Sequence, residues 1–544
     1  MRTSGSFLEL KDGHFVLPKG VRIKHPLVTK YYSRMRFKDN PEVVCRILDD
    51  VPEMRQYINE GFYRGWKKML ERSSSIKRSE TFSFNYDFRV EPYQHQKLAI
   101  AWCMSLPTCF LAAGTGTGKT FVGSVLTDMR LQRGTIKRAL IICPKAVVRS
   151  WYKSFQDFTH SGDKVIIAHN YLGNIRVPDE GWKKYKKAED KVYAEEYSIV
   201  ITTPGTFSNK RNHFYNAGFD QVILDESTMI GNGSKAAKAI IKLRDYVPFR
   251  LAFSATPGDV EKIYNQFQLL DNPFPCSTLT GFREMFMNQL PRNPHIYIPS
   301  HNSRERVADI IKDRLLFIDK EKCLDLPPRV IKEVYVEPGS KIKKKYRQLL
   351  KEYFVMINDK ELTVNSRLSH IIKLRQIMNG FCIIDGELEK IDDNPAKLRE
   401  TKKIVDSLDH PCIIWAWFKE DFRMLKEALK EYNPSVVNGE TSDIEAELDK
   451  VRSGESKVLI AHQASMQYGV SLNEAPTMIF YTPHYGEIGY NQAKARNRRL
   501  GSSAKQITEY RVTSGGIEDL IWKSIDEKTS FTDNILERAS ELAI

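Results

Sequence analysis

The 544-residue chain has no apolar run long enough to cross a membrane. Its longest runs include Ala139–Cys143 and Cys412–Phe418, which are strand-sized, whereas a span needs ~20 residues. No apolar segment follows residues 1–5, so we expect neither a secretory signal nor a membrane partner. The eight cysteines are scattered, without Cys-x-x-Cys spacing or a Cys/His cluster, which excludes a disulfide framework and a zinc site. We therefore expect reduced core cysteines in a cytoplasmic protein.

Acidic residues are fewer than basic ones, with 68 Asp and Glu against 83 Lys and Arg, so the formal net charge is +15. Such an excess is typical of proteins with a polyanionic partner, although soluble basic proteins without one also show it. Residues 1–90 hold 18 basic and 11 acidic side chains and many aromatic ones. Basic residues interleaved with aromatic ones either surround the core of a small domain or bind nucleic acid. We expect an N-terminal accessory domain at 1–90, where DNA or a protein partner would bind.

The rest of the chain divides into four regions by its hydrophobic pattern. Residues 91–275 alternate between apolar runs and polar helical stretches, which predicts a parallel sheet covered by helices on both faces. Residues 276–400 are helical and charge-mixed, and are predicted to form protrusions and an interdomain linker. A second alternation at 401–515 predicts a second lobe, and 516–544 a C-terminal helical brace. The expected strands are 110–113, 139–143, 165–168, 199–202, 222–224, 251–254, 412–417, 435–437, 458–461, 478–481 and 507–512.

A P-loop follows the expected strand 110–113 and opens an amphipathic helix. Its residues are Ala113, Gly114, Thr115, Gly116, Thr117, Gly118, Lys119 and Thr120. The glycines let backbone N–H groups point into a concave nest that matches phosphate oxygens. Lys119 can reach the β- and γ-phosphates of a nucleotide, and the hydroxyl of Thr120 can bind Mg²⁺.

Two adjacent carboxylates end the expected strand 222–224. Asp225 would hold Mg²⁺, directly or through water, and Glu226 would orient and polarise the attacking water. An Asp-Glu pair alone is common on protein surfaces. Two carboxylates at the end of a buried-type strand, about a hundred residues after a P-loop, indicate hydrolysis of a nucleoside triphosphate.

From this point the sequence resembles the superfamily 2 helicase-like motor ATPases. Residues 92–96 with Ala99 and Trp102 look like the adenine-reading Q-motif, because a glutamine amide can donate to and accept from the adenine edge at once. Counting back from Trp102 favours Gln96 as this residue, whereas the Pro-Tyr-Gln form favours Gln94. Both assignments stay open at this stage.

Further motifs of the first half follow in the order of that superfamily. Residues 140–145 with Trp151 resemble motif Ia, residues 200–207 motif Ib, and residues 253–257 motif III, which couples hydrolysis to domain movement in the family. The strand-end loops of motifs Ia and Ib contact a sugar-phosphate backbone through hydroxyl and N–H groups. The resemblance implies DNA contacts at Lys145, Thr203, Pro204 and Gly205.

The second half completes the set of motifs. Residues 412–418 resemble motif IV, residues 458–472 motif V and residues 492–501 motif VI. In motif VI the Arg-x-x-Arg spacing places Arg496 and Arg499 about one helical turn apart, on one face. The resemblance makes Arg499 the arginine finger and Arg496 its neighbour in the catalytic site. It also implies nucleotide contacts at Gly469 and Gln492 and a DNA contact at Ser471.

Three features resemble the Snf2-like branch of double-stranded DNA translocases. About 155 residues separate motifs III and IV, where this branch carries helical protrusions. Within that interval, Leu326–Arg329 resembles the family's interdomain crossing, and residues 370–379 its Leu-Arg-Gln helix. Residues 510–519 resemble its C-terminal brace. The chain departs from eukaryotic members with Ser227-Thr228 in motif II and Ser502 after motif VI, which favours a compact bacterial or phage type.

The resemblance implies an α/β fold with two RecA-like parallel-sheet lobes, helical insertions and a small N-terminal domain. It implies a DNA-dependent ATPase that uses ATP and Mg²⁺ and moves along double-stranded DNA as its lobes open and close. Such a protein would act as a monomer in the bacterial cytoplasm or nucleoid, or in a phage-infected cell. The alternatives are a strand-separating or branch-migration helicase and, from another class, a non-catalytic nucleic-acid clamp.

Overall fold

The structure is a computed structural model of the whole chain. It describes residues 9–11, 14–17, 29–31, 34–38, 44, 47, 50–51, 54, 60–169, 174–177, 181–184, 197–255, 257–290, 293–323, 327–358, 364–384, 386–441, 443–463, 465, 472–483, 490, 493–494, 497, 504–523 and 525–526.

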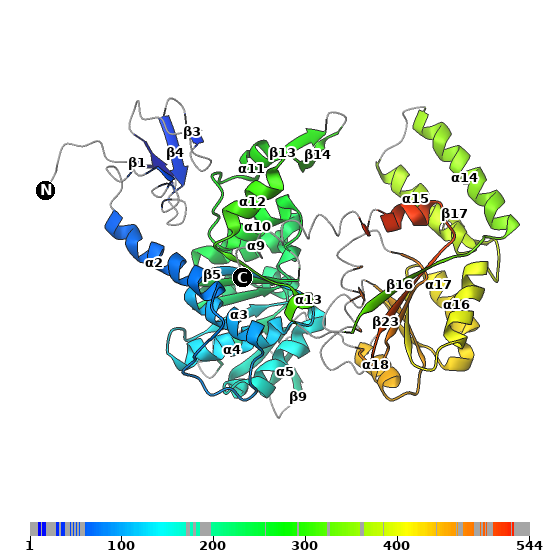
Figure 1. The fold of residues 1–544 in the computed structure, drawn as a ribbon, viewed down its shortest axis with the longest axis horizontal. Helices are drawn as coiled ribbons and strands as arrows, with labels where there is room; N and C mark the ends of the chain where they lie inside the picture. The colour runs from blue at the N-terminus through cyan, green and yellow to red at the C-terminus, as the bar shows by residue number, and fades with distance from the viewer. Residues whose placement is uncertain are drawn as a thin grey trace. The chain divides into compact units, whose positions relative to one another are not determined.

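Two compact units make up the chain (Figure 1). Unit 1 contains residues 1–323 with 532–544, and unit 2 contains residues 324–531. The boundary between them falls inside 276–400, the stretch that the sequence predicted as protrusions and linker. Within the described residues, no helix combines the length and the apolar character that crossing a membrane requires.

A nine-stranded sheet forms the centre of unit 1, in the order β15-β5-β12-β11-β6-β10-β7-β8-β9. Neighbouring strands are parallel except in the pairs β7–β8 and β8–β9. Parallel strands buried on both faces read as continuous apolar runs, as this sequence does. The strands are β5 (Thr108–Ala113), β6 (Ala139–Ile142), β7 (Val165–His169), β8 (Asn174–Val177), β9 (Gly181–Lys184), β10 (Ile199–Thr202), β11 (Gln221–Asp225), β12 (Phe249–Ser254) and β15 (Leu315–Ile318).

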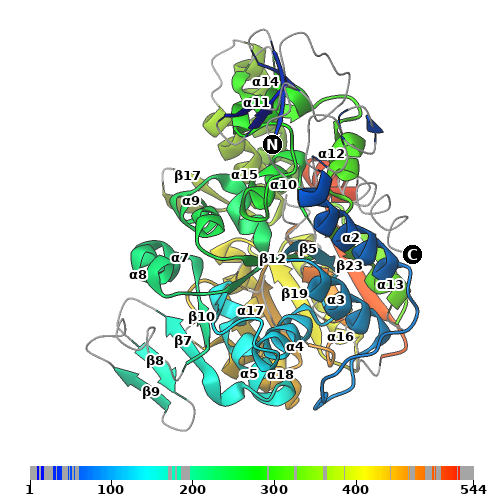
Figure 2. The same cartoon turned by 90° about the vertical axis from the view of Figure 1, so that its left-hand side faces the viewer.

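Helices cover both faces of this sheet. Residues of α7, α8 and α9 share one buried cluster with Leu140, Val200 and Val222 of the strands. Helices α3, α4 and α5 lie side by side (Figure 2). The helices of unit 1 that pack around the sheet are α3 (Gln94–Ser105), α4 (Lys119–Gln132), α5 (Val148–Phe158), α7 (Pro204–Asn209), α8 (Arg211–Asn216), α9 (Lys235–Ile241) and α10 (Val260–Leu269), with the 3-10 helices η2 (Lys145–Val147), η3 (Gly162–Lys164), η4 (Ser227–Asn232) and η5 (Lys242–Asp245).

The N-terminal part of unit 1 contains a small antiparallel sheet in the order β1-β2-β4-β3. A long helix, α2, leads from it to the large sheet, and the Lys77 ammonium at its end donates to the carbonyls of Lys312 and Leu315, each at 2.7 Å. These elements are β1 (Glu9–Lys11), β2 (His14–Val16), β3 (Thr29–Tyr31), β4 (Arg34–Lys38) and α2 (Glu60–Lys77).

An insertion lies between α10 and β15. A cluster of aromatic rings from Tyr264, Phe274, Phe282 and Phe286 packs its first helix against α10. The chain then forms a hairpin, a helix and the edge strand β15. The elements of this part are α11 (Leu279–Phe286), β13 (Met287–Leu290), β14 (Asn293–Pro299), α12 (Ser303–Ile311) and α13 (Lys320–Cys323).

Unit 2 has a six-stranded, fully parallel sheet in the order β16-β23-β22-β19-β21-β20. A separate two-stranded hairpin, β17–β18, follows α15. The elements of unit 2 are β16 (Arg329–Tyr335), α14 (Ser340–Asn358), α15 (Val364–Met378), β17 (Phe381–Ile384), β18 (Glu387–Lys390), α16 (Ala396–Asp406), β19 (Cys412–Ala416), α17 (Lys419–Ala428), η6 (Lys430–Tyr432), β20 (Ser435–Val437), α18 (Ile444–Arg452), β21 (Val458–His462), β22 (Thr477–Phe480) and β23 (Ile507–Thr513).

A buried polar network joins the helices of unit 2 to one another. The Lys397 ammonium lies 2.5 Å from Glu518 and donates to Asn379 at 2.9 Å. The amide of Asn379 donates to Asp421 and Thr482, each at 2.8 Å.

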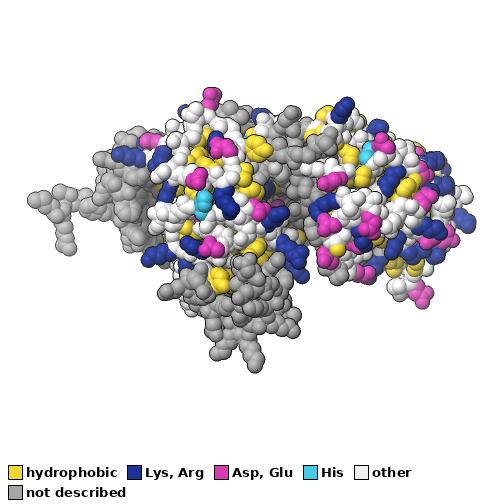
Figure 3. Space-filling model, turned by 90° about the horizontal axis from the view of Figure 1, so that it is seen from below, with side chains coloured by type: hydrophobic (Ala, Val, Ile, Leu, Met, Phe, Trp, Pro, Cys, Tyr) yellow, Lys and Arg dark blue, Asp and Glu magenta, His cyan; other side chains and the backbone are white. Residues whose placement is uncertain are grey.

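The surface of unit 2 carries charges of both signs. Lys and Arg side chains are interspersed with Asp and Glu over the face of unit 2 that Figure 3 draws.

The structure confirms the predicted fold class, an α/β protein with two parallel-sheet lobes. It differs in the stretch 276–400, which was expected to be helical but also contains strands β13 to β18. Two of these strands, β15 and β16, belong to the large sheets of the two units. Cysteine burial also differs, since Cys323 is exposed and Cys276 is half-buried, whereas the other described cysteines are buried and all seven are free.

Candidate active site

The predicted P-loop connects the end of β5 to the start of α4. Gly116 and Gly118 adopt φ of 91° and 88°, the left-handed region in which residues with a Cβ are strained. A Cβ on Gly118 would also overlap the side-chain amide of Gln96. The Thr117 hydroxyl donates to the Gly114 carbonyl at 2.8 Å and closes the loop. This local geometry is that of a backbone nest for phosphate oxygens.

Lys119 begins α4, and its ammonium turns back over the loop. It donates to the Ala113 carbonyl at 2.8 Å and lies 3.4 Å from the Gly114 carbonyl. These contacts hold the positive charge at the mouth of the nest, where the phosphates of a nucleotide would lie.

The first turns of α3 place Gln96, not Gln94, against the P-loop. The Gln96 amide donates to the Thr117 carbonyl at 3.2 Å, and its carbonyl oxygen accepts from the Tyr93 N–H at 3.0 Å. Gln94 is exposed, and its amide donates to the Glu80 carbonyl instead. Of the two glutamines that the sequence left open, Gln96 is the one that contacts the P-loop.

His95 is a second contact from α3 to the P-loop. Its Nε2 lies 3.0 Å from the Thr117 carbonyl, which can only accept, so Nε2 carries the proton. Burial lowers the pKa of this imidazole below its ordinary value of 6.5, and the hydrogen bond to Thr117 opposes that shift. His95 and Gln96 thus both fix the carbonyl that precedes Gly118.

Asp225 is buried at the end of β11. The Trp151 indole donates to its Oδ2 at 2.8 Å, and the Glu226 N–H donates to its Oδ1 at 3.0 Å. Burial raises the pKa of the Asp225 carboxyl, while the charge of Lys119 and these two hydrogen bonds lower it. The carboxylate is therefore held in one orientation beside the P-loop lysine.

Glu226 has an unusual backbone conformation, with φ of 50°. A non-glycine residue in the left-handed region costs of order 1–3 kcal/mol, and such residues cluster at active sites. The half-buried Glu226 is the residue that precedes η4. The left-handed conformation of Glu226 thus forms the turn between the end of β11 at Asp225 and η4.

The residues present fit a nucleotide with Mg²⁺. Among the described residues, no group of three or more His, Cys, Asp and Glu side chains could hold a metal ion. Mg²⁺ is commonly bound by one or two protein ligands together with substrate phosphates and water. The Thr120 hydroxyl and the Asp225 carboxylate are the protein ligands available beside the phosphate nest.

The residues expected to contact DNA lie at the same edge of the sheet as the P-loop. Lys145 follows β6 and is exposed, and Thr203 follows β10 and caps α7 by accepting the Thr206 N–H at 3.4 Å. Pro204 begins α7, and Gly205 next to it is exposed. Because β6 and β10 run parallel to β11, their carboxyl ends meet at the edge where Asp225 lies.

Several predicted residues lie outside the described residues. They are Thr256 of motif III and, in unit 2, Gly469, Ser471, Gln492, Arg496 and Arg499. Two described residues of motif VI itself are anchored in unit 2. The Asn497 amide donates to the Ala475 carbonyl at 2.8 Å, and the Arg329 guanidinium donates to the Lys494 carbonyl.

Gln266 of α10 is a site residue that the sequence did not reveal. Its side-chain oxygen accepts from the Ser227 hydroxyl, and its amide donates to the Pro257 carbonyl, each at 2.6 Å. It therefore joins the segment after Glu226 to motif III. The role of Trp151 beyond motif Ia was also missed. The sequence around Gln266 and Trp151 does not predict these roles, because their hydrogen-bond partners are distant in the sequence.

Comparison with known proteins agrees with this geometry. A family model described as "SNF2-related domain" matches residues 93–381, more than half of the chain, and one described as "Helicase conserved C-terminal domain" matches residues 396–501. The chain is 22% identical over 477 residues to "Putative ATP-dependent helicase/translocase YwqA" of Bacillus subtilis. This alignment covers 82% of the chain and 49% of YwqA, so the chain spans about half the length of that relative.

Two further relatives differ in how much of them the chain covers. Protein p41 of Acyrthosiphon pisum secondary endosymbiont phage 1 is 21% identical over 480 residues, which is 83% of this chain and 98% of p41. The human "DNA repair and recombination protein RAD54B" is 25% identical over 372 residues, which is 65% of this chain and 38% of RAD54B.

Proposed function

Because the chain belongs to the SNF2-related family of helicase-like ATPases, we propose that it is a DNA-dependent ATPase that translocates on double-stranded DNA. The observation that carries the proposal is the joint placement of the P-loop and the Asp225–Glu226 pair at one edge of the unit 1 sheet. The name of YwqA mentions a translocase and that of RAD54B mentions DNA, which supports translocation and DNA as the polymer.

The nucleotide would bind along the P-loop, with its phosphates on the backbone N–H groups of residues 114–118. Lys119 would neutralise the β- and γ-phosphates, and Gln96 would read the adenine edge. The His95 and Gln96 contacts to Thr117 support this assignment, since they fix the loop before any ligand arrives. A preorganised loop loses less conformational freedom when the nucleotide binds.

Thr120 and Asp225 would hold Mg²⁺, which supplies charge neutralisation at the phosphates. Glu226 would orient the attacking water and accept its proton. The hydrogen bonds of Asp225 to Trp151 and to the Glu226 N–H keep the two carboxylates apart in function. Asp225 would serve as the metal ligand beside Lys119, and Glu226 would act as the base.

Unit 2 would complete the catalytic site through Arg499, with Arg496 as its neighbour, and through Gly469 and Gln492. An arginine finger is worth ~10³–10⁵ in the rate of phosphoryl transfer. Neither unit alone contains all of these groups, so hydrolysis would require both. DNA that bridges the two units would favour this arrangement, and each cycle of closing and opening would move the protein along the duplex.

The DNA grip would be made of phosphate contacts at Lys145, Thr203, Pro204 and Gly205 in unit 1 and Ser471 in unit 2. Such contacts carry no base information, so binding should be tolerant of sequence and sensitive to salt. The net charge of +15 is consistent with a polyanionic partner.

The test is the ATPase rate without nucleic acid and with single-stranded DNA, duplex DNA, forked or four-way DNA, and RNA, at two salt concentrations. We expect strong stimulation by plain duplex that weakens as salt rises. Stimulation only by forks or junctions would replace the proposal with a strand-separating or branch-migration helicase. No hydrolysis under any condition, with DNA binding retained, would indicate a non-catalytic clamp.

A further inference from the structure

The turn at Glu226 depends on contacts that impose its conformation. Glu226 has φ of 50° and ψ of 52°, and a residue with a Cβ keeps such a left-handed conformation only where its surroundings fix it. On one side, the Glu226 N–H donates to the Asp225 carboxylate at 3.0 Å. On the other side, the Ser227 hydroxyl donates to the side chain of Gln266, 39 residues further along the chain. Ser227 therefore ties the turn to helix α10.

Gln266 uses both ends of its side-chain amide. Its oxygen accepts the Ser227 hydroxyl at 2.6 Å, and its NH₂ group donates to the carbonyls of Pro257, at 2.6 Å, and Lys262, at 3.0 Å. Gln266 and Ser227 are both 0% exposed, so the loss of either partner would leave a buried polar group unsatisfied. The two donated bonds fix the orientation of the amide, and its oxygen thus faces Ser227.

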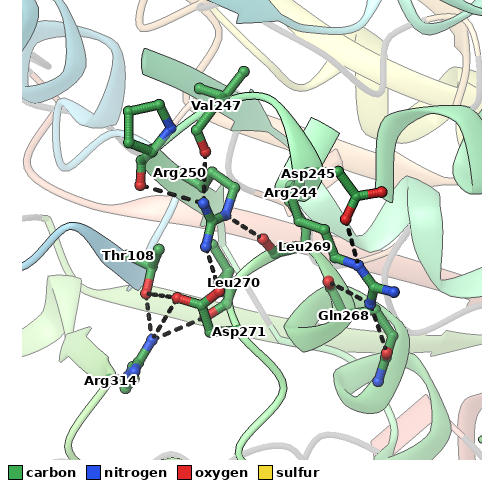
Figure 4. Close-up of polar contacts among 11 residues, drawn as sticks. Thr108, Arg244, Asp245, Val247, Arg250, Gln268, Leu269, Leu270, Asp271 and Arg314 are labelled. Atoms are coloured by element: carbon green, nitrogen blue, oxygen red, sulfur yellow. Dashed lines mark hydrogen bonds and ion pairs between the residues drawn. The ribbon is translucent and has the colours of Figure 1, made fainter. Parts of the chain in front are cut away.

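Helix α10, which carries Gln266, is anchored at its last turn. In Figure 4 the guanidinium of Arg250, in β12, donates to the Leu269 carbonyl at 2.8 Å, and the guanidinium groups of Arg250 and Arg314 converge on Asp271. Basic side chains that bond the last carbonyls of a helix stabilise its C-terminal end. Since Leu269 is only three residues after Gln266, the amide has a fixed place relative to the sheet.

We propose that Gln266 is a positioning residue for Glu226: through the Ser227 hydroxyl, it holds the left-handed turn in which Glu226 lies. The inference rests on the proposed function, in which Glu226 is the general base. A base acts only within hydrogen-bond reach of the water that it deprotonates. A small displacement of the turn should therefore lower the rate of hydrolysis even though the carboxylate is still present.

The test compares turnover with nucleotide affinity in the full chain. The ATPase rate is measured with duplex DNA, and ADP affinity by displacement of a fluorescent ADP. Gln266→Leu keeps most of the buried volume and removes both ends of the amide, whereas Ser227→Ala removes only the hydroxyl. We expect each variant to lower kcat about 10- to 100-fold, the range for a misplaced catalytic group, with the KM for ATP and the affinity for ADP unchanged.

A double-mutant cycle with Glu226→Gln distinguishes positioning of the base from a loss of stability. Without the carboxylate there is no base to position, so Gln266→Leu should lower the residual rate of Glu226→Gln no further. A fall as large as that in the wild-type background would show a merely structural role and would overturn the proposal. Ser227→Ala, the smaller change, tests the same contact in the same cycle if Gln266→Leu does not fold.

Asn265→Leu is the matched control, because Asn265 is the neighbouring amide of α10 and donates to the Gly231 carbonyl of η4 at 2.8 Å. It should turn over ATP as the wild type does. Wild-type kcat in either Gln266→Leu or Ser227→Ala, or an equal loss in Asn265→Leu, overturns the proposal. Glu226→Gln separates the two levels of inference. If that variant turns over ATP normally, the proposed function fails at its base; if it alone loses turnover, only Gln266 is wrongly assigned.

Discussion

Glu226 and Lys119 illustrate how single residues divide the chemistry of the site. Lys119 contacts the loop that would hold the phosphates, whereas Glu226 follows the buried Asp225 and adopts a left-handed backbone conformation at the start of η4. We expect Glu226→Gln to lower the ATPase rate by about 10²–10⁴-fold, the usual worth of a general base, while ATP affinity is retained. Lys119→Ala should lose both turnover and tight ATP binding.

Steady-state turnover and equilibrium ATP binding, measured on the same preparations, check this division of roles. Glu226→Asp is the control for charge, since it keeps the carboxylate but shortens its reach. Turnover that survives in Glu226→Gln, or ATP binding that disappears with it, would contradict the role of Glu226 as the base.

Gly123 shows a different residue-scale constraint, that of packing behind the site. A Cβ at this position of α4 would lie 2.5 Å from Trp151 and 2.9 Å from Phe253. Gly123→Ala should therefore destabilise unit 1 by about 1–3 kcal/mol through overpacking, although alanine favours helix. Urea unfolding measures the effect. Gly205→Ala, where a Cβ meets no atom within 4 Å, should unfold like the wild type. Equal stability of the two variants would show that Trp151 can move aside.

At the scale of elements, the contact of α3 with the P-loop should depend on pH. The folded state holds the His95 pKa below its ordinary 6.5, so the unfolded chain takes up a proton at a higher pH than the folded chain does. The stability that neutral His95 contributes is thus complete above about pH 6.5 and is lost as pH falls below that value. Unfolding free energies at pH 7 and pH 5 should differ less in His95→Gln than in the wild type.

His301→Gln is the control for this pH dependence, because His301 is exposed. It should lose stability between pH 7 and pH 5 as the wild type does. If His95→Gln loses as much unfolding free energy between pH 7 and pH 5 as the wild type and His301→Gln do, the α3 contact does not contribute to the pH dependence.

The buried pair Lys397–Glu518 should stabilise unit 2 as an assembly of elements. It joins α16 to the segment 517–523 after β23, and both side chains are fully buried. Lys397→Met leaves Glu518 buried without its counter-charge, which should cost about 3–5 kcal/mol of unfolding free energy. Lys419→Met, which breaks the exposed pair with Glu440, should have no measurable effect. A small loss in Lys397→Met would mean that water reaches Glu518.

Strand positions followed from local pattern wherever a strand is central and buried. Residues 199–202 were predicted and form β10 with those bounds. Strands β15 and β16 were not predicted. They are strands because β15 pairs with β5 and β16 pairs with β23, and the sequence around β15 and β16 does not reveal these distant partners. The choice between Gln94 and Gln96 also needed the helix, since only its geometry shows which amide reaches Thr117.

For the whole molecule, the family models confirm the predicted membership of the Snf2-like, helicase-like ATPases, and motif order in the sequence was sufficient to reach it. The DNA-contacting surface could not be inferred in the same way. Basic and acidic side chains are interspersed on the drawn face of unit 2, so net charge alone marks no interface there. The domain boundaries and the roles of Arg496 and Arg499 stay predictions, because both arginines lie outside the described residues.

The proposed function, in which unit 2 supplies Arg499 to the P-loop of unit 1, leads to a prediction about the whole chain. If one molecule supplies both the P-loop and the arginines, Lys119→Ala and Arg499→Ala proteins should each be inactive and should remain inactive when mixed. If the arginine came from a second molecule, the mixture would contain intact sites, built from the P-loop of one variant and the arginine of the other. DNA-stimulated ATPase activity of the mixture, compared with wild type diluted by either variant, distinguishes the two arrangements. Recovered activity in the mixture would show that the working form is an oligomer. We expect no recovered activity, because a monomer would use the arginine of its own unit 2.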